Sequence, residues 1–147
     1  VDLPELWDFF TALPTTVVVD HMGRPDVSKP IDGPEFALFL KFMREHPNVW
    51  SKVSCPERLS VTGPKALNGE QAAYQDVVPF ARRVVEEFPD RVLWGTDWPH
   101  PNLKDHMPDD GLLVDFIPAI APTPELQQKL LVDNPMRLYW PEETQGA

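Results

Sequence analysis

The sequence predicts an α/β fold in which parallel strands form one sheet and helices cover its outer side. Two observations support this prediction. Three short runs are rich in β-branched residues, and the segments between them carry apolar residues three and four positions apart. Because parallel strands need a crossover connection, this alternation favours βαβ units over hairpins. The predicted strands are 16–20, 48–54 and 91–95.

Helical periodicity recurs in five segments, and prolines stand at the start of several of them. Pro4, Pro34 and Pro124 occupy first-turn positions, where the missing N–H does no harm. The sequence Asp133-Asn134-Pro135 is predicted to end the last helix before a loose tail, residues 141–147. The predicted helices are 4–13, 34–45, 76–88, 111–120 and 124–132.

The longest irregular segment runs from Pro56 to Ala73 and contains Gly63-Pro64 and Asn68-Gly69. A loop of this length inside a compact domain is typically functional. We therefore expect it to act as a lid or a binding loop.

The composition is that of an ordinary soluble globular protein, with a net charge of −10 over 147 residues, 42% hydrophobic and 24% charged residues. The acidic balance and the lack of a Lys/Arg run argue against nucleic acid and membrane surfaces as partners. No apolar stretch is long enough to span a bilayer, and the start Val1-Asp2-Leu3-Pro4 has neither a basic n-region nor an apolar h-region, so we expect a cytoplasmic protein. The chain begins with Val1 directly before a predicted helix, which suggests a piece of a longer protein.

Cys55 is the only cysteine, so an internal disulfide and a cysteine-built zinc site are both excluded. We expect it to be a small buried side chain. A nucleophilic role is disfavoured, because Ser54-Cys55-Pro56 lacks the glycines that flank a nucleophile on a tight strand-to-helix turn.

A polar loop follows each predicted strand, and these loops span residues 20–25, 54–58 and 96–100. In a parallel sheet the strand tips meet at one edge, where side chains face a pocket rather than a core. This topology brings together the imidazole of His21, the guanidinium of Arg58 and the carboxylate of Asp97. Each has a plainer alternative: His21 could be merely hydrogen-bonded, Arg58 could pair with Glu57 at the surface, and Asp97 could cap a turn. Their shared placement favours a site.

The three side chains suit hydrolysis of an anionic substrate. A carboxylate near an imidazole can take a proton from water, and the imidazole can donate a hydrogen bond to an oxygen that gains charge. The Arg58 guanidinium offers a planar fork to a substrate carboxylate. His100 is a further candidate for substrate binding at the rim of the same pocket, with a supporting structural role as its alternative.

The runs 20–25 and 94–101 resemble the amidohydrolase superfamily, in its amidohydrolase-related branch. The segments 54–59, 108–113 and 134–139 strengthen a narrower similarity to members that act on pyrone dicarboxylate lactones. The resemblance implies a (β/α)8 barrel, of which residues 1–147 are the C-terminal part with the last three strands.

The resemblance also implies an activity, the opening of the lactone ring of 2-pyrone-4,6-dicarboxylate in the breakdown of lignin-derived aromatics. By position, Asp97 would be the general base that activates water, His21 would polarise the lactone carbonyl, and Arg58 would bind a substrate carboxylate. Members of this narrow type work without a metal or other cofactor, whereas many relatives use zinc or manganese. In a metal-dependent lactonase or decarboxylase, His21 and Asp97 would be the local ligands.

One departure from the family is large. The family's first strand carries a His-x-His pair, and this sequence contains none. The further arginines that bind carboxylates from earlier strands are missing as well. We therefore expect a fragment that is inactive alone, with unpaired sheet edges and bare apolar surface, and whose partner is the missing N-terminal half of the barrel. A non-catalytic anion-binding fragment is the alternative outside enzymes.

Overall fold

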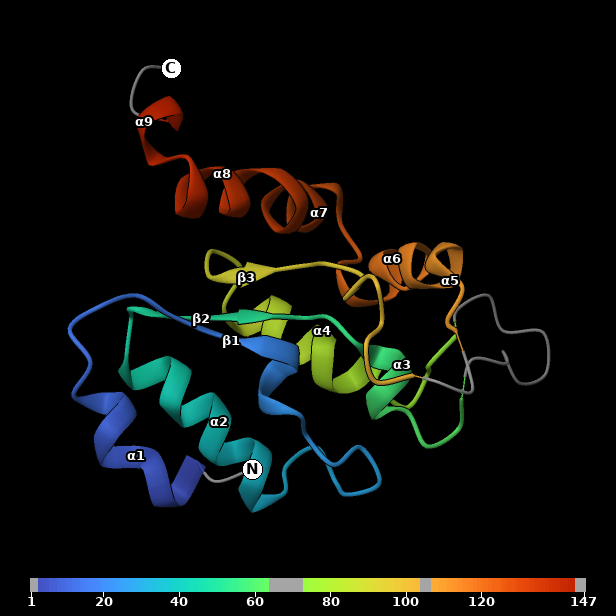
Figure 1. The fold of residues 1–147 in the computed structure, drawn as a ribbon, viewed down its shortest axis with the longest axis horizontal. Coiled ribbons are helices and arrows are strands. Elements are labelled where there is room, and N and C mark those ends of the chain that lie inside the picture. The colour runs from blue at the N-terminus through green and yellow to red at the C-terminus, as the bar shows by residue number, and fades with distance from the viewer. Residues whose placement is uncertain (1–2, 64–72, 104–106, 145–147) are drawn as a thin grey trace.

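The sheet is the centre of the fold. A computed structural model describes residues 3–63, 73–103 and 107–144, and within these ranges it contains a sheet in the order β1-β2-β3 (Figure 1). The strands are β1 (Val17–Val19), β2 (Val49–Lys52) and β3 (Val92–Leu93). Both pairings are parallel, with Val18 opposite Trp50 and Ser51 opposite Val92. The predicted parallel α/β arrangement is confirmed, although each strand is shorter than predicted.

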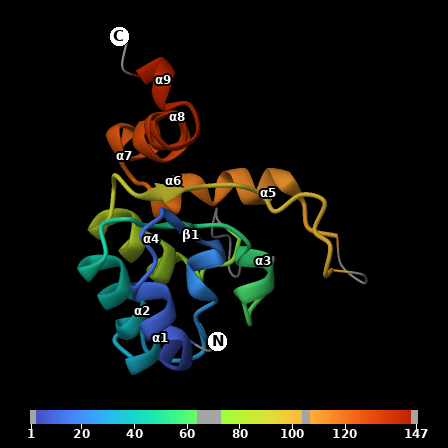
Figure 2. The ribbon, with the colours of Figure 1, turned by 60° about the vertical axis from the view of Figure 1, so that its left-hand side comes forward.

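The helices alternate with the strands, and several are short. They are α1 (Leu3–Thr11), α2 (Pro34–Glu45), α3 (Pro56–Leu59), α4 (Val78–Glu87), α5 (Asp110–Asp115), α6 (Ile117–Ile120), α7 (Pro124–Gln128), α8 (Asn134–Tyr139) and α9 (Pro141–Thr144). Both views place α1 and α2 towards the β1 edge, and α7 and α8 beyond β3 (Figures 1 and 2). Among the described residues, none of the helices is long and apolar enough to cross a membrane.

The C-terminal region differs from the prediction. The helix does not end at Asp133-Asn134-Pro135, because the chain passes through a π-helical turn, Lys129–Asp133, directly into α8. A wider turn is compatible with a residue that has no N–H, and Pro135 lies in the first turn of α8. The Asn134 amide donates to the carbonyls of Pro89 and Val92, which ties α8 to β3. In the predicted tail, Pro141–Thr144 form the helical turn α9, and residues 145–147 lie outside the described residues.

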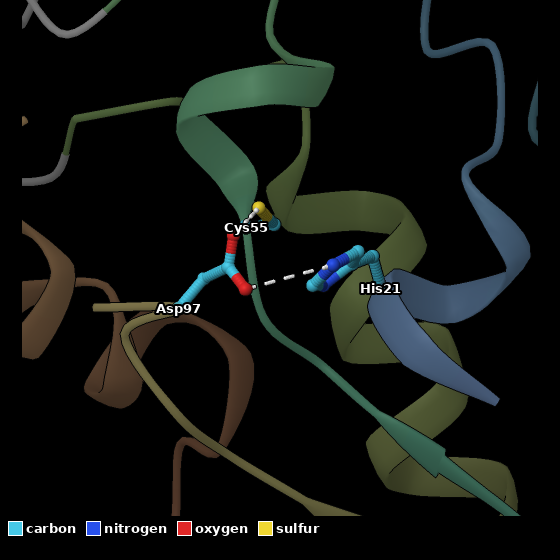
Figure 3. A group of neighbouring side chains, drawn as sticks. All are labelled: His21, Cys55 and Asp97. Carbon is cyan, nitrogen blue, oxygen red and sulfur yellow. Dashed lines mark hydrogen bonds and ion pairs between the residues drawn. The ribbon is translucent and has the colours of Figure 1, made fainter. Parts of the chain in front are cut away.

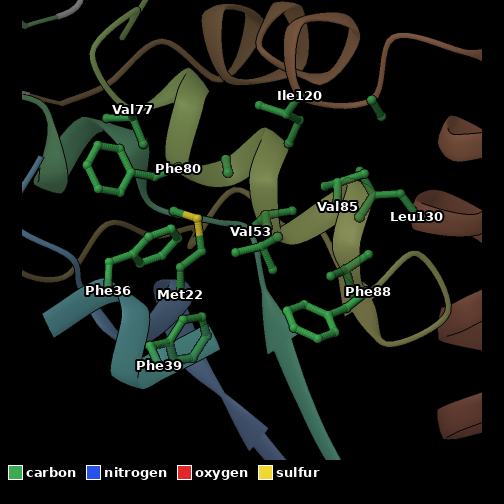
Figure 4. Close-up of a cluster of buried hydrophobic side chains, with 14 of the residues drawn as sticks. Met22, Phe36, Phe39, Val53, Val77, Phe80, Val85, Phe88, Ile120 and Leu130 are labelled. Carbon is green, nitrogen blue, oxygen red and sulfur yellow. The ribbon is translucent and has the colours of Figure 1, made fainter. Parts of the chain in front are cut away.

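The hydrophobic core lies between the sheet and the helices α2, α4 and α6 (Figure 4). Residues of α2 and α4 at helical spacing point into it, so the 3.6-residue period of these segments produces the packing. The buried side chains drawn there include Met22, Phe36, Phe39, Val53, Phe80, Val85, Phe88, Ile120 and Leu130. By contrast, all three valines of β1 are only partly buried, which leaves this edge of the sheet open among the described residues.

The fold places three loops at one edge of the sheet. β1 leads into a 3₁₀ turn, Asp20–Gly23, β2 leads into α3, and β3 leads into the turn around Asp97. Because both strand pairings are parallel, these loops share the C-terminal edge. The predicted lid, residues 56–73, contributes α3 at its start, and its part 64–72 lies outside the described residues.

Candidate active site

Three side chains from the three strand-end loops point toward one another: His21, Cys55 and Asp97 (Figure 3). Each lies just beyond its strand, and each has a positive φ, of 54°, 64° and 64° respectively. A non-glycine residue in this region costs on the order of 1–3 kcal/mol. Each chain therefore turns sharply where its strand ends, and the turn directs the side chain into the cluster.

The Asp97 carboxylate is the centre of the cluster. Its Oδ2 accepts hydrogen bonds from Cys55 Sγ at 3.1 Å and Arg58 Nη1 at 3.4 Å, and its Oδ1 lies 3.8 Å from His21 Nε2. Thr96 Oγ1, not the Asp97 side chain, accepts the hydrogen bond from the Trp98 amide, so turn capping does not explain Asp97.

The charge state of Asp97 follows from these contacts. Burial raises its pKa, but the Cys55 thiol donor and the neighbouring His21 and Arg58 outweigh that effect and hold the pKa below its usual range. The side chain remains 23% exposed. Asp97 is therefore an ionised carboxylate that water and a small molecule can reach.

His21 is oriented by a buried serine. Its Nδ1 forms a hydrogen bond with Ser54 Oγ at 2.8 Å, and Ser54 is itself buried. This bond leaves Nε2 on the side that faces Asp97. A ring held at one nitrogen keeps the other aimed in a fixed direction, as a group that polarises a carbonyl must be.

Arg58 pairs with Asp97 rather than with Glu57. Its side chain is 16% exposed, and Nη1 also contacts Cys55 Sγ at 3.7 Å. The Glu57 side chain is fully buried beside His100 and Cys55. The surface pairing weighed from the sequence is therefore wrong, and the guanidinium lies inside the cluster.

Cys55 is buried, as predicted, but its position in the cluster was missed from sequence. Burial raises the pKa of the thiol above its ordinary value, and the hydrogen bond to Asp97 raises it further. Cys55 is thus a hydrogen-bond donor and not an activated nucleophile. Its place directly beyond β2, matching His21 after β1 and Asp97 after β3, is the signal that could have identified it.

His100 lies behind Asp97 and not at an open rim. Its ring is 1% exposed and lies between Glu57 Oε1, 3.5 Å from Nδ1, and Asp110 Oδ1, 3.2 Å from Nε2. Its backbone N–H donates to the Asp97 carbonyl at 2.8 Å. This arrangement matches the supporting role considered for His100. A direct contact with substrate would require the ring to move out from between Glu57 and Asp110.

One nitrogen, one sulfur and one carboxylate oxygen of His21, Cys55 and Asp97 lie within 4.8 Å of one another, a spacing that a metal ion could bridge. A metal binds a thiolate, whereas this thiol has a raised pKa, keeps its proton and donates a hydrogen bond to Asp97. The Arg58 cation also occupies the same carboxylate. Two ready donors are fewer than the three protein ligands of a catalytic zinc, so the described residues alone do not complete a metal site.

A parallel sheet with an acid, an imidazole and a guanidinium at its strand ends defines a class, the α/β-barrel enzymes whose sites lie on the loops after the strands. The model of the Amidohydrolase family matches residues 1–140. The chain therefore belongs to the amidohydrolase family.

The curated relatives that match include two hydrolases and a D-galactarolactone isomerase. The chain is 93% identical to a 2-pyrone-4,6-dicarboxylate hydrolase from Comamonas testosteroni over 97% of its length, which is 47% of that protein. It is 42% identical to a 4-sulfomuconolactone hydrolase from Hydrogenophaga intermedia, over 83% of the chain and 38% of the relative. The chain thus spans less than half the length of these relatives.

Solved structures agree on the fold. An Agrobacterium tumefaciens protein in its apo form superposes with a TM-score of 0.73 at 29% identity, covering 94% of this chain and 46% of that one. A Pseudomonas putida protein, provisionally assigned as a 2-pyrone-4,6-dicarboxylic acid hydrolase, gives 0.71 at 29% identity, with 94% and 48% covered. Half of each neighbour therefore has no counterpart here.

Proposed function

We propose that this chain supplies the catalytic base and part of the substrate pocket of an enzyme that opens the lactone ring of 2-pyrone-4,6-dicarboxylate. The observation that carries the proposal is the ionised, partly exposed Asp97 held beside His21 and Arg58. The high identity to the Comamonas testosteroni hydrolase supports this substrate. The same proposal includes a role in lignin-derived aromatic breakdown and a cytoplasmic location.

Each side chain has its own task in the proposed reaction. Asp97 accepts a proton from the attacking water as the hydroxide equivalent adds to the lactone carbonyl, and the ring C–O bond then breaks while Asp97 returns the proton to the leaving ring oxygen. His21 donates from Nε2 to the carbonyl oxygen as it gains negative charge, while Ser54 Oγ donates its hydrogen to Nδ1 and so keeps the N–H on Nε2. Arg58 has five N–H donors, so its contact with Asp97 leaves others for a substrate carboxylate.

The proposed catalyst is the barrel and not this chain alone. The chain spans 47% of the Comamonas testosteroni relative, and it contains no His-x-His sequence. We propose that residues 1–147 are part of one barrel domain whose remaining strands cover the open β1 edge. The other half of the barrel is then the partner that the chain needs for activity.

The test uses a completed enzyme, in which this chain is joined to the part of the Comamonas testosteroni relative that it does not cover. Ring opening of 2-pyrone-4,6-dicarboxylate is followed for wild type, Asp97→Asn and Asp115→Asn, an exposed carboxylate on α5. We expect Asp97→Asn to lower kcat by about three orders of magnitude or more, on the scale of losing a general base and its charge. The Asp115 control stays within a factor of two. Near-normal turnover of Asp97→Asn would reject the base assignment.

A metal-dependent lactonase or decarboxylase is the second candidate, and the close approach of His21 and Asp97 is the observation behind it. The two candidates separate when metal is removed. The proposed metal-free hydrolase keeps its rate after dialysis against a chelator, whereas a metal enzyme loses it and regains it when zinc or manganese is added back.

A further inference from the structure

Glu57 is a fully buried carboxylate next to the candidate site. It lies on the short helix α3, between the site residues Cys55 and Arg58, yet its side chain is 0% exposed. Its Oε1 lies 3.4 Å from Cys55 Sγ, whose single hydrogen serves Asp97 at the shorter distance, and 3.5 Å from His100 Nδ1, an ion-pair distance without a hydrogen bond. Among the described residues, neither Glu57 Oε2 nor His100 Nδ1 has a hydrogen-bond partner. Burying an incompletely bonded carboxylate costs free energy, and natural proteins keep such costs mainly where function requires them.

His100 is the partner that connects Glu57 to the base. Its imidazole is buried between α3 and Asp110 at the start of α5, so the ring cannot move without opening this packing. Its backbone N–H donates to the Asp97 carbonyl, across a turn in which both residues have positive φ. The conformation of Asp97 therefore depends on where His100 is held.

Glu57 and His100 connect two loops that come from different strands. Glu57 belongs to the loop after β2, which also supplies Cys55 and Arg58, and His100 belongs to the loop after β3, which supplies Asp97. The two donors to Asp97 Oδ2 thus reach it across this junction, at 3.1 and 3.4 Å. A shift of one loop against the other would break both hydrogen bonds.

We propose that Glu57 and His100 form a positioning pair that fixes the loop after β3 against α3 and so holds the Asp97 carboxylate on Cys55 and Arg58. This inference rests on the proposed role of Asp97 as the base. Groups behind a reacting side chain fix its orientation, and small misplacements of a reacting group lower the rate strongly. The pair acts through Asp97 and contacts no substrate.

The kinetic test compares Glu57→Ala, Glu57→Gln and Glu45→Ala in the completed enzyme. Glu45 is an exposed glutamate at the end of α2 and serves as the matched control. We expect Glu57→Ala to lower kcat ten- to a hundredfold with KM changed less than threefold, since orientation of the base is lost and substrate contacts remain. Glu57→Gln keeps the shape and a hydrogen-bonding oxygen, so it recovers at least a third of kcat. A folded Glu57→Ala enzyme with kcat within twofold of wild type would overturn the proposal.

A structural test is independent of turnover. In a crystal structure of the Glu57→Ala enzyme we expect Asp97 Oδ2 to lie more than 4 Å from Cys55 Sγ, and an unchanged hydrogen bond would overturn the pair. If Glu57→Ala does not fold, His100→Gln replaces it with the same expectations, because it removes the ring and keeps the backbone amide. An inactive wild-type completed enzyme would reject the proposed function, while the displacement of Asp97 would still decide the positioning pair.

Discussion

The helix-covered core and the strand-end edge of this molecule differ in both chemistry and backbone geometry. The core is apolar and fully buried, as at Phe42, Val84 and Val92, which are at most 1% exposed. The edge carries charged and polar side chains on residues with positive φ, as at His21 and Asp97. Burial of apolar side chains in the core stabilises the fold, whereas backbone strain and desolvation at the strand-end edge destabilise it. The core thus stabilises an edge that could not maintain its own geometry.

The largest effect is expected for the core substitution Phe80→Ala in the completed enzyme. Phe80 on α4 is 4% exposed and packs edge-to-face on Phe36, with ring centroids 5.0 Å apart. We expect the free energy of unfolding to fall by about 3–5 kcal/mol, because a large cavity is left behind. Urea unfolding measures it, with Phe9→Ala, 60% exposed on α1, as the control within about 0.5 kcal/mol. Equal losses at both positions would mean that the core is not where the stability lies.

A substitution at the strand-end edge should change substrate binding more than the free energy of unfolding. We expect Arg58→Ala to raise KM by an amount equivalent to about 2–5 kcal/mol, because a partly buried cation for the substrate carboxylate is lost. Steady-state kinetics of the completed enzyme measure it, and Arg82→Ala on the exposed side of α4 is the matched control. An unchanged KM would show that Arg58 does not meet the substrate.

The same contrast explains which features could be predicted from sequence. The periodic apolar residues of α2 and α4 identified the core helices, and the parallel order of the strands placed His21, Arg58 and Asp97 at one edge. Periodicity reports burial, so it is informative wherever packing decides the structure. Periodicity correctly identified the layers, and the parallel strand order correctly identified the edge at which these three side chains meet.

Contacts at the edge depend on backbone turns that periodicity does not report. The hydrogen bond from Cys55 to Asp97 requires positive φ at both residues, and neither is a glycine that would signal such a turn. The burial of Glu57 follows from the same local geometry of α3. The helix end predicted at Asn134-Pro135 failed for a related reason, since a π-helical turn accommodated the proline.

A smaller effect is expected beside the site, where Asp76 anchors the start of the predicted lid. Ser60 Oγ and the amides of Val61 and Thr62 donate to its carboxylate at 2.6, 2.7 and 3.2 Å. Burial raises the pKa of Asp76, but these donors outweigh burial and hold it below the ordinary value. Ionised Asp76 therefore stabilises the fold above its unfolded pKa, and this contribution is lost as the pH falls through the folded pKa.

Asp76→Asn should lower the free energy of unfolding by about 1–2 kcal/mol at neutral pH, the scale of hydrogen bonds to a charged group. The difference from wild type should shrink as the pH is lowered through the range in which Asp76 takes up a proton. Urea unfolding at a series of pH values measures it, with the exposed Asp8→Asn on α1 as the control. A difference that does not change with pH would contradict the assigned charge.

The smallest effect is expected at Cys55. Its side chain is as buried as the core residues, yet it is hydrogen-bonded to the Asp97 carboxylate at the strand-end edge. As its S–H donates to Asp97, Cys55→Ala removes one of the groups that lower the pKa of that carboxylate, whereas Cys55→Ser retains a donor. We expect the acid limb of kcat/KM to move to higher pH in the alanine variant and to stay near wild type in the serine variant. The pH dependence of ring opening by the three completed enzymes measures it. Coincident acid limbs would mean that the thiol contributes packing alone, and Cys55 would then belong with the core.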